Sequence, residues 1–260
     1  MQFISPEHEQ ILRHNKLNSF EQFWNFQGEW FEEPNHARQG WSGVNRVMLD
    51  VDGQAGLGAF LKRQHNYIRR TWRHPFSGVT TFFCEFTTLC YLIKRGVPVP
   101  TPLFFDEQVI EDGRDAVLVT AELAGYRPLD VVVPHIFGRP SSLRQQRALI
   151  RSLAAAVAKM HAARMQHRAL YPKHLFVRQH ESGNFDTVII DLEKARIKIF
   201  PILRTLHDLA TLNRELSWLS RSSRLYFLKQ YYASAKLGWL EKRIALRIDS
   251  RSEKRRKGRY

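Results

Sequence analysis

The sequence predicts an α+β fold with two lobes, in which a β-rich first lobe with one main helix is followed by a mainly helical second lobe. Strand-like stretches separated by turns fill the chain up to about residue 122. From residue 142 onward, apolar residues recur at helical spacing. Between the two patterns, residues 123 to 130 contain Gly125 and Pro128, which interrupt both and mark where the lobes are expected to meet.

The length of the chain suits one two-lobed domain. With 260 residues, of which 43% are hydrophobic, the chain can bury a substantial core. We expect a single domain over residues 1 to 260. Its first lobe is expected at about 17 to 123, its second lobe at about 128 to 235, and a basic C-terminal helix and tail at 237 to 260.

The first lobe is expected to begin with a helix and a strand in the aromatic-rich stretch 17 to 33. Gly40-Trp41-Ser42-Gly43-Val44 is rich in small residues and predicts a turn between strands. The stretches 44 to 51 and 58 to 63 then predict an antiparallel hairpin, joined by a turn at 52 to 56.

One helix and two more strands complete this lobe. Apolar residues at helical spacing predict a helix over 80 to 94, which three prolines between residues 98 and 102 bring to an end. Strands are expected at 103 to 110 and at 116 to 122.

The second lobe is expected to begin with a long Ala-rich helix from 142 to about 161, with apolar residues on one face. Short strands are expected at 174 to 178 and 187 to 190, and helical spacing returns over 209 to 219. A β-rich half with one helix, then a connector, then a helical half is the order of a two-lobed protein-kinase-like fold.

The charge of the chain favours a polyanionic partner. Lys and Arg total 40 against 25 Asp and Glu, a net charge of +15, which suits nucleic acid, an anionic membrane, nucleotide phosphates or a phosphorylated glycan. Just before the basic tail, Leu237, Leu240, Ile244 and Ile248 share one helical stripe. This pattern fits either a basic amphipathic helix on an anionic membrane or an ordinary docked helix.

Cysteine usage and hydropathy point to a cytoplasmic protein. Cys84 and Cys90 form no CxxC pair, so neither a disulfide framework nor a cysteine zinc site is indicated. The first 15 residues do not form a secretory signal peptide, and apolar runs fall far short of the roughly 20 residues that span a bilayer. A peripheral place on the inner face of the cytoplasmic membrane is compatible with this expectation.

Two residues of the first lobe suggest phosphate chemistry. Phosphoryl transfer depends on side chains that hold phosphates and divalent metal, among them a strand lysine that a helix glutamate orients. Lys62 lies in the strand expected at 58 to 63, and Glu85 follows 23 residues later on the helix expected at 80 to 94. Taken singly, each has an ordinary alternative as an edge-strand or solvent-facing charge. The apolar neighbours of Glu85 favour the paired interpretation.

The second lobe contains the more specific signal. The β-branched stretch 187 to 190 ends at Asp191, where a kinase places its metal-binding aspartate, although a turn-capping role is the alternative. Residues 167 to 174 begin with His167-Arg168 and have the length of the catalytic loop H-R-D-L-x-x-x-N. Ala169 occupies the position of the loop aspartate, 22 residues before Asp191.

In these residues the chain resembles the InaA branch of the lipopolysaccharide kinase family, over roughly residues 20 to 235. The resemblance depends on Glu32-Glu33-Pro34-Asn35, Gly40 to Val44, Lys62-Arg63, Gln166 to His174 and, most specifically, Asp191-Leu192-Glu193-Lys194-Ala195-Arg196. It implies a kinase-like fold and the binding of ATP and Mg²⁺. It also implies phosphate transfer to a lipopolysaccharide core sugar or a related anionic glycolipid, as in the core kinases of the family.

The resemblance assigns roles to individual residues. The expected catalytic residues are Asp191, Lys62 and His167. The residues expected at the nucleotide are Lys62, which would hold phosphate, Glu85, which would orient it, and Gly40, Gly43 and Glu122. The expected metal ligands are Asp191 and His174. Asp208 resembles the buried aspartate that braces the catalytic loop.

Ala169 divides the functional expectation in two. Its side chain cannot accept a proton, a departure from the core kinases that the InaA-like members share. One hypothesis is an ATP-dependent sugar kinase, with His167 or His174 as the substitute proton acceptor and a structural bracket as the alternative for His167. The other is a catalytically impaired pseudokinase that binds nucleotide or glycolipid. A nucleic-acid partner is not favoured, because it would leave Lys62, Glu85 and Asp191 unexplained.

Overall fold

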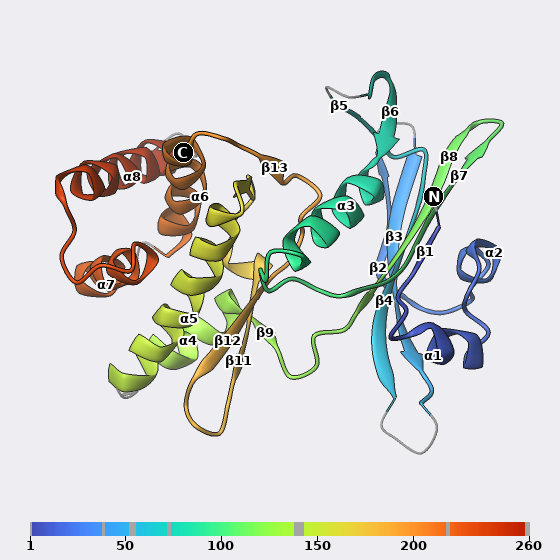
Figure 1. The fold of residues 1–260 in the computed structure, drawn as a ribbon, viewed down its shortest axis with the longest axis horizontal. Coiled ribbons are helices and arrows are strands. Elements are labelled where there is room, and N and C mark those ends of the chain that lie inside the picture. The colour runs from blue at the N-terminus through green and yellow to red at the C-terminus, as the bar shows by residue number, and fades with distance from the viewer. Residues whose placement is uncertain are drawn as a thin grey trace. The chain divides into compact units, whose positions relative to one another are not determined.

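Figure 1 shows the computed structural model of the chain, which describes residues 2–37, 40–51, 56–71, 74–137, 143–216 and 219–257. The chain divides into two compact units. The first unit comprises Met1–Tyr91 and Pro100–Ala124, and the second comprises Leu92–Val99 and Gly125–Tyr260. An antiparallel sheet dominates the first unit and helices dominate the second, so the predicted α+β division is confirmed.

The first unit is built on a six-stranded antiparallel sheet with the strand order β1-β7-β8-β4-β3-β2. Its strands are β1 (Phe3–Ile4), β2 (Trp30–Ala37), β3 (Gly40–Leu49), β4 (Leu57–His65), β7 (Pro102–Ile110) and β8 (Gly113–Ala121). The predicted hairpin is the pair β3 and β4, and the two strands predicted after the helix are β7 and β8. The predicted turn at 52 to 56 lies, except for Gly56, outside the described residues.

Helices cover both faces of this sheet (Figure 1). On one face, α1 (Glu9–His14) and α2 (Phe20–Trp24) contribute to a buried apolar cluster with residues of β3, β4, β7 and β8. On the other face, α3 (Thr81–Ile93) packs through Phe86, whose ring stacks on Phe105 of β7 with 4.5 Å between centroids. The predicted helix over 80 to 94 is therefore confirmed. The helix α1 and the hairpin of β5 (Ile68–Thr71) and β6 (His74–Thr80) were not predicted.

The turn predicted at Gly40 to Val44 is wrong, because these residues form the first half of β3. The two glycines serve close packing instead of chain reversal. A Cβ atom on Gly40 would collide with the backbone carbonyl of His65, and one on Gly43 would lie 2.7 Å from the ring of Trp30. Small residues were needed here because neighbouring groups approach the strand closely, a demand that local sequence does not reveal.

The second unit is mainly helical, as predicted. Its helices are α4 (Leu129–Phe137), α5 (Leu143–Ala162), α6 (Pro201–Glu215), α7 (Arg221–Tyr231) and α8 (Trp239–Lys257). The short strands are β9 (Arg127–Pro128), β10 (Met165–Gln166), β11 (Leu175–Gln179), β12 (Phe185–Ile189) and β13 (Arg196–Ile197), with the 3₁₀ turn η1 (Pro172–His174). The helix predicted from 142 to 161 is α5, and its apolar face is buried. The helix predicted at 209 to 219 begins earlier, at Pro201, and α4 was not predicted.

The C-terminal helix α8 is docked on the protein. Ile244 and Ile248 of the predicted apolar stripe are buried, and Ser252 donates a hydrogen bond to the carbonyl of Ala210 in α6 at 3.0 Å. Leu240, the remaining helical member of the stripe, is half exposed. Of the two interpretations of this helix, the structure therefore favours docking. Among the described residues, no helix combines the length and the hydropathy that crossing a bilayer requires.

Docking of α8 predicts unequal effects of two substitutions in the same helix. Ile248 is 4% exposed and Leu246 is 70% exposed. We expect Ile248→Ala to lower the free energy of unfolding by about 2 kcal/mol or more, because it removes buried methyl groups and leaves a cavity. Leu246→Ala should change it by less than about 0.5 kcal/mol. Urea unfolding followed by circular dichroism measures both, and equal effects would contradict docking.

Candidate active site

Lys62 and Glu85 form a short ion pair in the first unit. Lys62 lies on β4 between Val44 of β3 and Leu118 of β8, while Glu85 lies on α3. Because strand side chains alternate between faces, Leu61 and Arg63 point to the face that α1 and α2 cover, and Lys62 points to the face of α3. Its Nζ lies 2.6 Å from Oε1 of the buried Glu85. The structure thus brings together two residues that the sequence placed 23 positions apart.

Arg63, beside Lys62, has a structural role that the sequence did not indicate. Its guanidinium donates hydrogen bonds to the carbonyls of Trp24 and Phe26 at 2.6 and 3.0 Å, and to Oδ1 of Asn45 at 2.8 Å. It also lies over the ring of Trp30. Burial lowers the pKa of Arg63, but the ordinary pKa of arginine is so high that the side chain stays protonated. Arg63 therefore ties the N-terminal segment to β4 behind Lys62.

The remaining residues expected at the nucleotide are engaged within the first unit. Glu122 accepts from Arg46, with 2.9 Å between Nη2 and Oε2, and its carboxylate lies against Gly58, where a Cβ atom would collide with it. The space beside Gly40 and Gly43 is already filled by protein atoms. These contacts give all three residues packing or pairing roles, whereas Lys62 and Glu85 form the arrangement that phosphate binding requires.

In the second unit, the buried carboxylate of Asp208 on α6 organises the loop that follows β10. It accepts from the backbone N–H groups of His167 at 2.7 Å and Arg168 at 2.9 Å. His161 and His207 lie 3.2 and 3.1 Å away through ring nitrogens. Burial alone would raise the pKa of Asp208, but the hydrogen bonds from both histidines and the charge of His161 outweigh it, so this pKa lies well below its usual range. Asp208 has the geometry expected of a loop brace.

His167 is enclosed by this loop with both ring nitrogens in use. Nε2 donates to the carbonyl of Ile190 at 2.9 Å, and Nδ1 accepts from the backbone N–H of Ala169 at 3.3 Å. Burial lowers the pKa of His167, which agrees with the neutral tautomer that these two bonds require. A proton acceptor needs a free lone pair near the substrate, so the geometry favours the structural bracket over the catalytic role.

His174 and Asp191 form the candidate metal site of the second unit. Asp191 follows β12 in a left-handed conformation, with φ +58. This conformation is uncommon for residues other than glycine and persists only where the surrounding structure determines it. Nδ1 of His174 donates to the carbonyl of Ala169 at 2.8 Å. In neutral His174, Nε2 therefore carries a lone pair, and this atom lies 3.2 Å from Oδ2 of Asp191. Two lone-pair atoms at that separation suit a shared divalent cation, while an imidazolium paired with the carboxylate is the metal-free alternative.

The donor set fits such an ion only in part. Among the described residues, no group of three or more His, Cys, Asp or Glu side chains is arranged to hold a metal. A cation on Asp191 and His174 would therefore take its remaining ligands from water or from phosphate oxygens, as Mg²⁺ commonly does. A metal bound with nucleotide fits this site better than a structural metal.

The loop keeps its shape around Ala169, which is buried. Its N–H donates to His167 and its carbonyl accepts from His174, so the backbone of this residue is bonded on both sides. Neither contact depends on the side chain. The missing carboxylate therefore removes a chemical group without removing the support of the loop.

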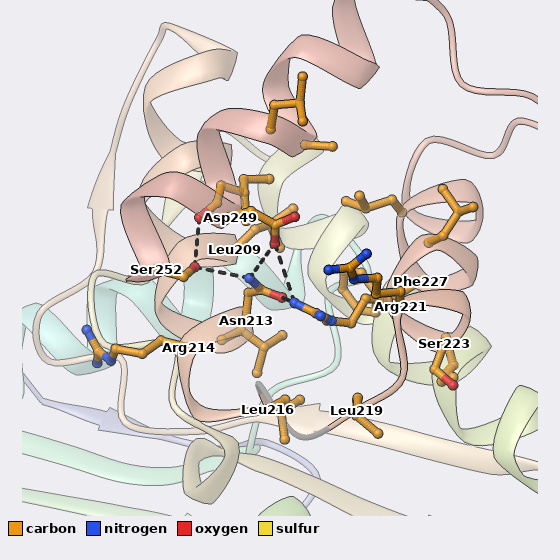
Figure 2. A pocket seen from close by; sticks show the side chains of 18 of the residues that line it. Leu209, Asn213, Arg214, Leu216, Leu219, Arg221, Ser223, Phe227, Asp249 and Ser252 are labelled. Atoms are coloured by element: carbon orange, nitrogen blue, oxygen red, sulfur yellow. Dashed lines mark hydrogen bonds and ion pairs between the residues drawn. The ribbon is translucent and has the colours of Figure 1, made fainter. Parts of the chain in front are cut away.

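A separate pocket lies within the second unit, among α5, α6, α7 and α8 (Figure 2). Its volume is about 600 Å³, and most of its lining is leucine, isoleucine and phenylalanine. At one side, Asp249 accepts from Asn213 at 3.0 Å, and Arg224 lies 3.5 Å away. The sequence-predicted site residues are absent from the described lining, so this pocket is distinct from the candidate active site.

The bonds of Asp208 predict a large effect of its neutralisation. We expect Asp208→Asn to lower the free energy of unfolding by about 3 kcal/mol, because charge-assisted hydrogen bonds would be lost in a buried place. Asp186, a half-exposed carboxylate paired with Arg178 and His180, is the matched control, and Asp186→Asn should cost less than about 1 kcal/mol.

The same bonds predict how this difference depends on pH. The folded-state pKa of Asp208 is depressed, so its contribution to stability is complete above the unfolded-state pKa of about 4 and is lost as the pH falls towards the folded value. Urea unfolding of both variants at pH 7, 5 and 3 measures this dependence. A gap between wild type and Asp208→Asn that grew on acidification would contradict it.

Comparison with known proteins agrees with this geometry. The family model described as lipopolysaccharide kinase (Kdo/WaaP) family matches residues 21–232. Protein InaA of Escherichia coli K12 is 31% identical over 219 residues, which cover 84% of this chain and 97% of that protein. The lipopolysaccharide core heptose(I) kinase WaaP of Pseudomonas aeruginosa PAO1 is 29% identical over 155 residues, 57% of this chain and 58% of that protein.

A solved structure shares the fold over almost the whole chain. WaaP in complex with acyl carrier protein matches with a TM-score of 0.72 and 22% identity, and the match covers 98% of each chain. The kinase-like fold predicted from the sequence is thus confirmed. With a family model over most of the chain and a relative of similar length, the resemblance is confirmed as well: the chain belongs to the lipopolysaccharide kinase (Kdo/WaaP) family.

Proposed function

We propose that this protein is an ATP-dependent phosphotransferase that acts on a lipopolysaccharide core sugar or a related anionic glycolipid. The observation that carries the proposal is the pair of His174 and Asp191, whose ring nitrogen and carboxylate oxygen lie 3.2 Å apart. His174 ends the loop whose start Asp208 braces, and Asp191 follows β12. The ion pair of Lys62 and Glu85 supports it independently. Both pairs are of the kind that phosphoryl transfer uses to hold phosphates and metal.

Each of these residues has a definite part in the proposed reaction. Lys62 would hold the nucleotide phosphates, and Glu85 would keep its ammonium group oriented. Asp191 and His174 would be the protein ligands of the divalent cation. When bound, that cation supplies positive charge against the triphosphate and the phosphoryl group in transfer. His167 stays neutral and keeps the loop in place.

The proposed reaction lacks an obvious proton acceptor. A general base contributes about a hundred- to ten-thousandfold to such reactions, whereas positioning and electrostatic stabilisation carry most of phosphoryl transfer. We therefore propose a slow kinase. The competing proposal, favoured by Ala169 itself, is a pseudokinase that binds nucleotide or glycolipid without turnover.

The proposed partners follow from charge and from family membership. Nucleotide and an anionic core or glycolipid acceptor both complement a chain of net charge +15. We propose a cytoplasmic location, peripheral to the inner face of the cytoplasmic membrane, where such acceptors are anchored. The basic C-terminus would add electrostatic attraction to that surface.

Restoring the absent carboxylate tests the kinase proposal. Wild-type protein with labelled ATP, a divalent cation and deacylated core oligosaccharide should transfer phosphate slowly, and Ala169→Asp should raise the rate by about a hundredfold or more because it supplies a base. Ala169→Asn is the matched control, since it has a similar volume and no basic group. Asp191→Ala sets the background. Transfer by wild type and by Ala169→Asp that stays at this background would refute the kinase and leave the pseudokinase.

The imidazole at the metal site predicts an unusual choice of metal. Mg²⁺ is bound by oxygen ligands and water, whereas Mn²⁺, as a first-row transition-metal ion, accepts a nitrogen ligand more readily than Mg²⁺ does. With ADP present, we expect tighter binding of Mn²⁺ than of Mg²⁺, and His174→Asn should shift the ratio of the two affinities towards Mg²⁺ by about tenfold, or about 1.4 kcal/mol.

Electron paramagnetic resonance of Mn²⁺, with Mg²⁺ as competitor, measures this ratio without turnover, so it applies to a kinase and a pseudokinase alike. His180→Asn is the control, because His180 pairs with Asp186 on β12 outside the metal site. The same ratio in wild type and in His174→Asn would exclude His174 as a ligand.

A further inference from the structure

Residues 196–203, which run from β13 into the first turn of α6, form an exposed apolar segment. All eight residues are exposed, and five of them are large and apolar. These five, each between 39% and 69% exposed, are Ile197, Ile199, Phe200, Ile202 and Leu203. Single exposed apolar residues are normal, but a contiguous group marks an interaction surface.

The backbone holds the 196–203 segment in this conformation. Its first two residues are β13, which pairs with β10, and the N–H of Lys198 donates to the carbonyl of Arg164 at 2.8 Å. From beneath, the buried Arg204 donates to the carbonyls of Lys198 and Ile199 at 2.7 and 3.1 Å. A frayed loop would lack these bonds. The apolar side chains are therefore presented to solvent by an anchored backbone.

The charged residues of the segment and of the two positions before it are all basic. Lys194, Arg196 and Lys198 are exposed, and the sequence has no Asp or Glu from residue 194 to residue 207. Large apolar side chains that enter the boundary between headgroups and acyl chains, combined with Lys and Arg, are the features of interfacial membrane binding. Each basic residue near an anionic surface adds attraction, and long basic side chains can reach the headgroups while their stems stay in apolar surroundings.

Other occupants fit the segment less well. The cores of protein interfaces are depleted in lysine, whereas Lys198 stands between Ile197 and Ile199. A second copy of this chain would bring the same basic segment, and a further charge of +15, against the first. An anionic lipid surface complements both the apolar side chains and the charge.

We propose that the 196–203 segment is a membrane-binding surface that docks this protein on an anionic bilayer. The segment begins five residues after Asp191, and the strand that it pairs with, β10, leads directly into the loop of His167. Docking here would bring a lipid-anchored acceptor towards the metal ligands, a consequence that rests on the proposed function. The docking itself does not depend on turnover.

The test is binding of the full chain to vesicles of phosphatidylglycerol and phosphatidylcholine, measured by flotation without nucleotide or acceptor. Wild type should bind the anionic vesicles and bind pure phosphatidylcholine at least tenfold more weakly. The double variant Ile199→Ser, Phe200→Ser should bind the anionic vesicles at least tenfold more weakly than wild type. The double variant Lys194→Glu, Lys198→Glu should also bind more weakly than wild type. The difference between this variant and wild type should grow as the fraction of anionic lipid in the vesicles rises.

The matched control is Trp239→Ser combined with Leu246→Ser, which removes two side chains of α8 that are 71% and 70% exposed. This variant should bind as wild type does. Equal losses in the control and in the Ile199, Phe200 variant would assign membrane binding elsewhere and overturn the proposal, as would failure of wild type to bind. Because the substituted side chains are exposed, unchanged thermal midpoints are expected and verify folding.

Two further measurements distinguish membrane docking from dimer formation and from the proposed kinase activity. Sedimentation analysis tests for a dimer. If wild type were a dimer that the Ile199→Ser, Phe200→Ser variant dissociated, and did not bind vesicles, the segment would be an interface between copies and membrane docking would be overturned. Asp191→Ala should still bind vesicles. If wild type bound vesicles but transferred no phosphate, the result would count against the proposed kinase activity and leave membrane docking in place.

Discussion

The buried carboxylate of Asp208 is the interaction on which the candidate site of the second unit depends. It lies on α6 and accepts from the backbone of His167 and Arg168, so it fixes a loop that is remote in sequence. Arg168 adopts a left-handed conformation, with φ +70, which such a loop sustains only when surrounding bonds determine it. The positions of His167, Ala169 and His174 all follow from this support.

Because Asp208 holds the backbone, the loop does not need the aspartate that it lacks. The backbone N–H of Ala169 donates to His167, and its carbonyl accepts from His174. Neither bond involves the side chain. The backbone of this loop is thus kept without the carboxylate of residue 169. The ion pair of Lys62 and Glu85 in the first unit is intact as well. The choice between slow kinase and pseudokinase therefore concerns the side chain of residue 169.

The stretch from Asp191 to Asp208 contains three different features within eighteen residues. A metal-ligand candidate stands at its start, an exposed apolar and basic segment occupies its middle, and the buried brace stands at its end. Arg204 connects the last two, since it is buried within α6 and donates to the carbonyls of the exposed segment. An enzyme that acts on lipid-anchored acceptors would benefit from this proximity of surface and site.

Local sequence patterns were sufficient for most strands of the large sheet, for the main helices and for the elements that carry the candidate site residues. The hydrophobic strand before Asp191, the strand of Lys62 and the helix of Glu85 were predicted because a periodicity of two or 3.6 residues is a local property. The helices α1, α4 and α7 were missed because each is short, with 6 to 11 residues. The turn predicted at Gly40 is a strand, because neighbouring groups approach that glycine.

Long-range contacts decided what the patterns could not. Three features depend on residues that are distant in sequence: the partner of Nε2 of His167, the docking of α8 and the exposure of residues 196–203. An apolar stripe has the same sequence whether it is covered by protein or left open, so burial separates the stripe of α8 from the 196–203 segment only in the folded chain. The sequence by itself determined the kinase-like order of elements and the absence of a carboxylate at residue 169. Only the tertiary structure decided which side chains are satisfied internally and which remain available, because hydrogen-bond partners and burial are properties of the packed chain.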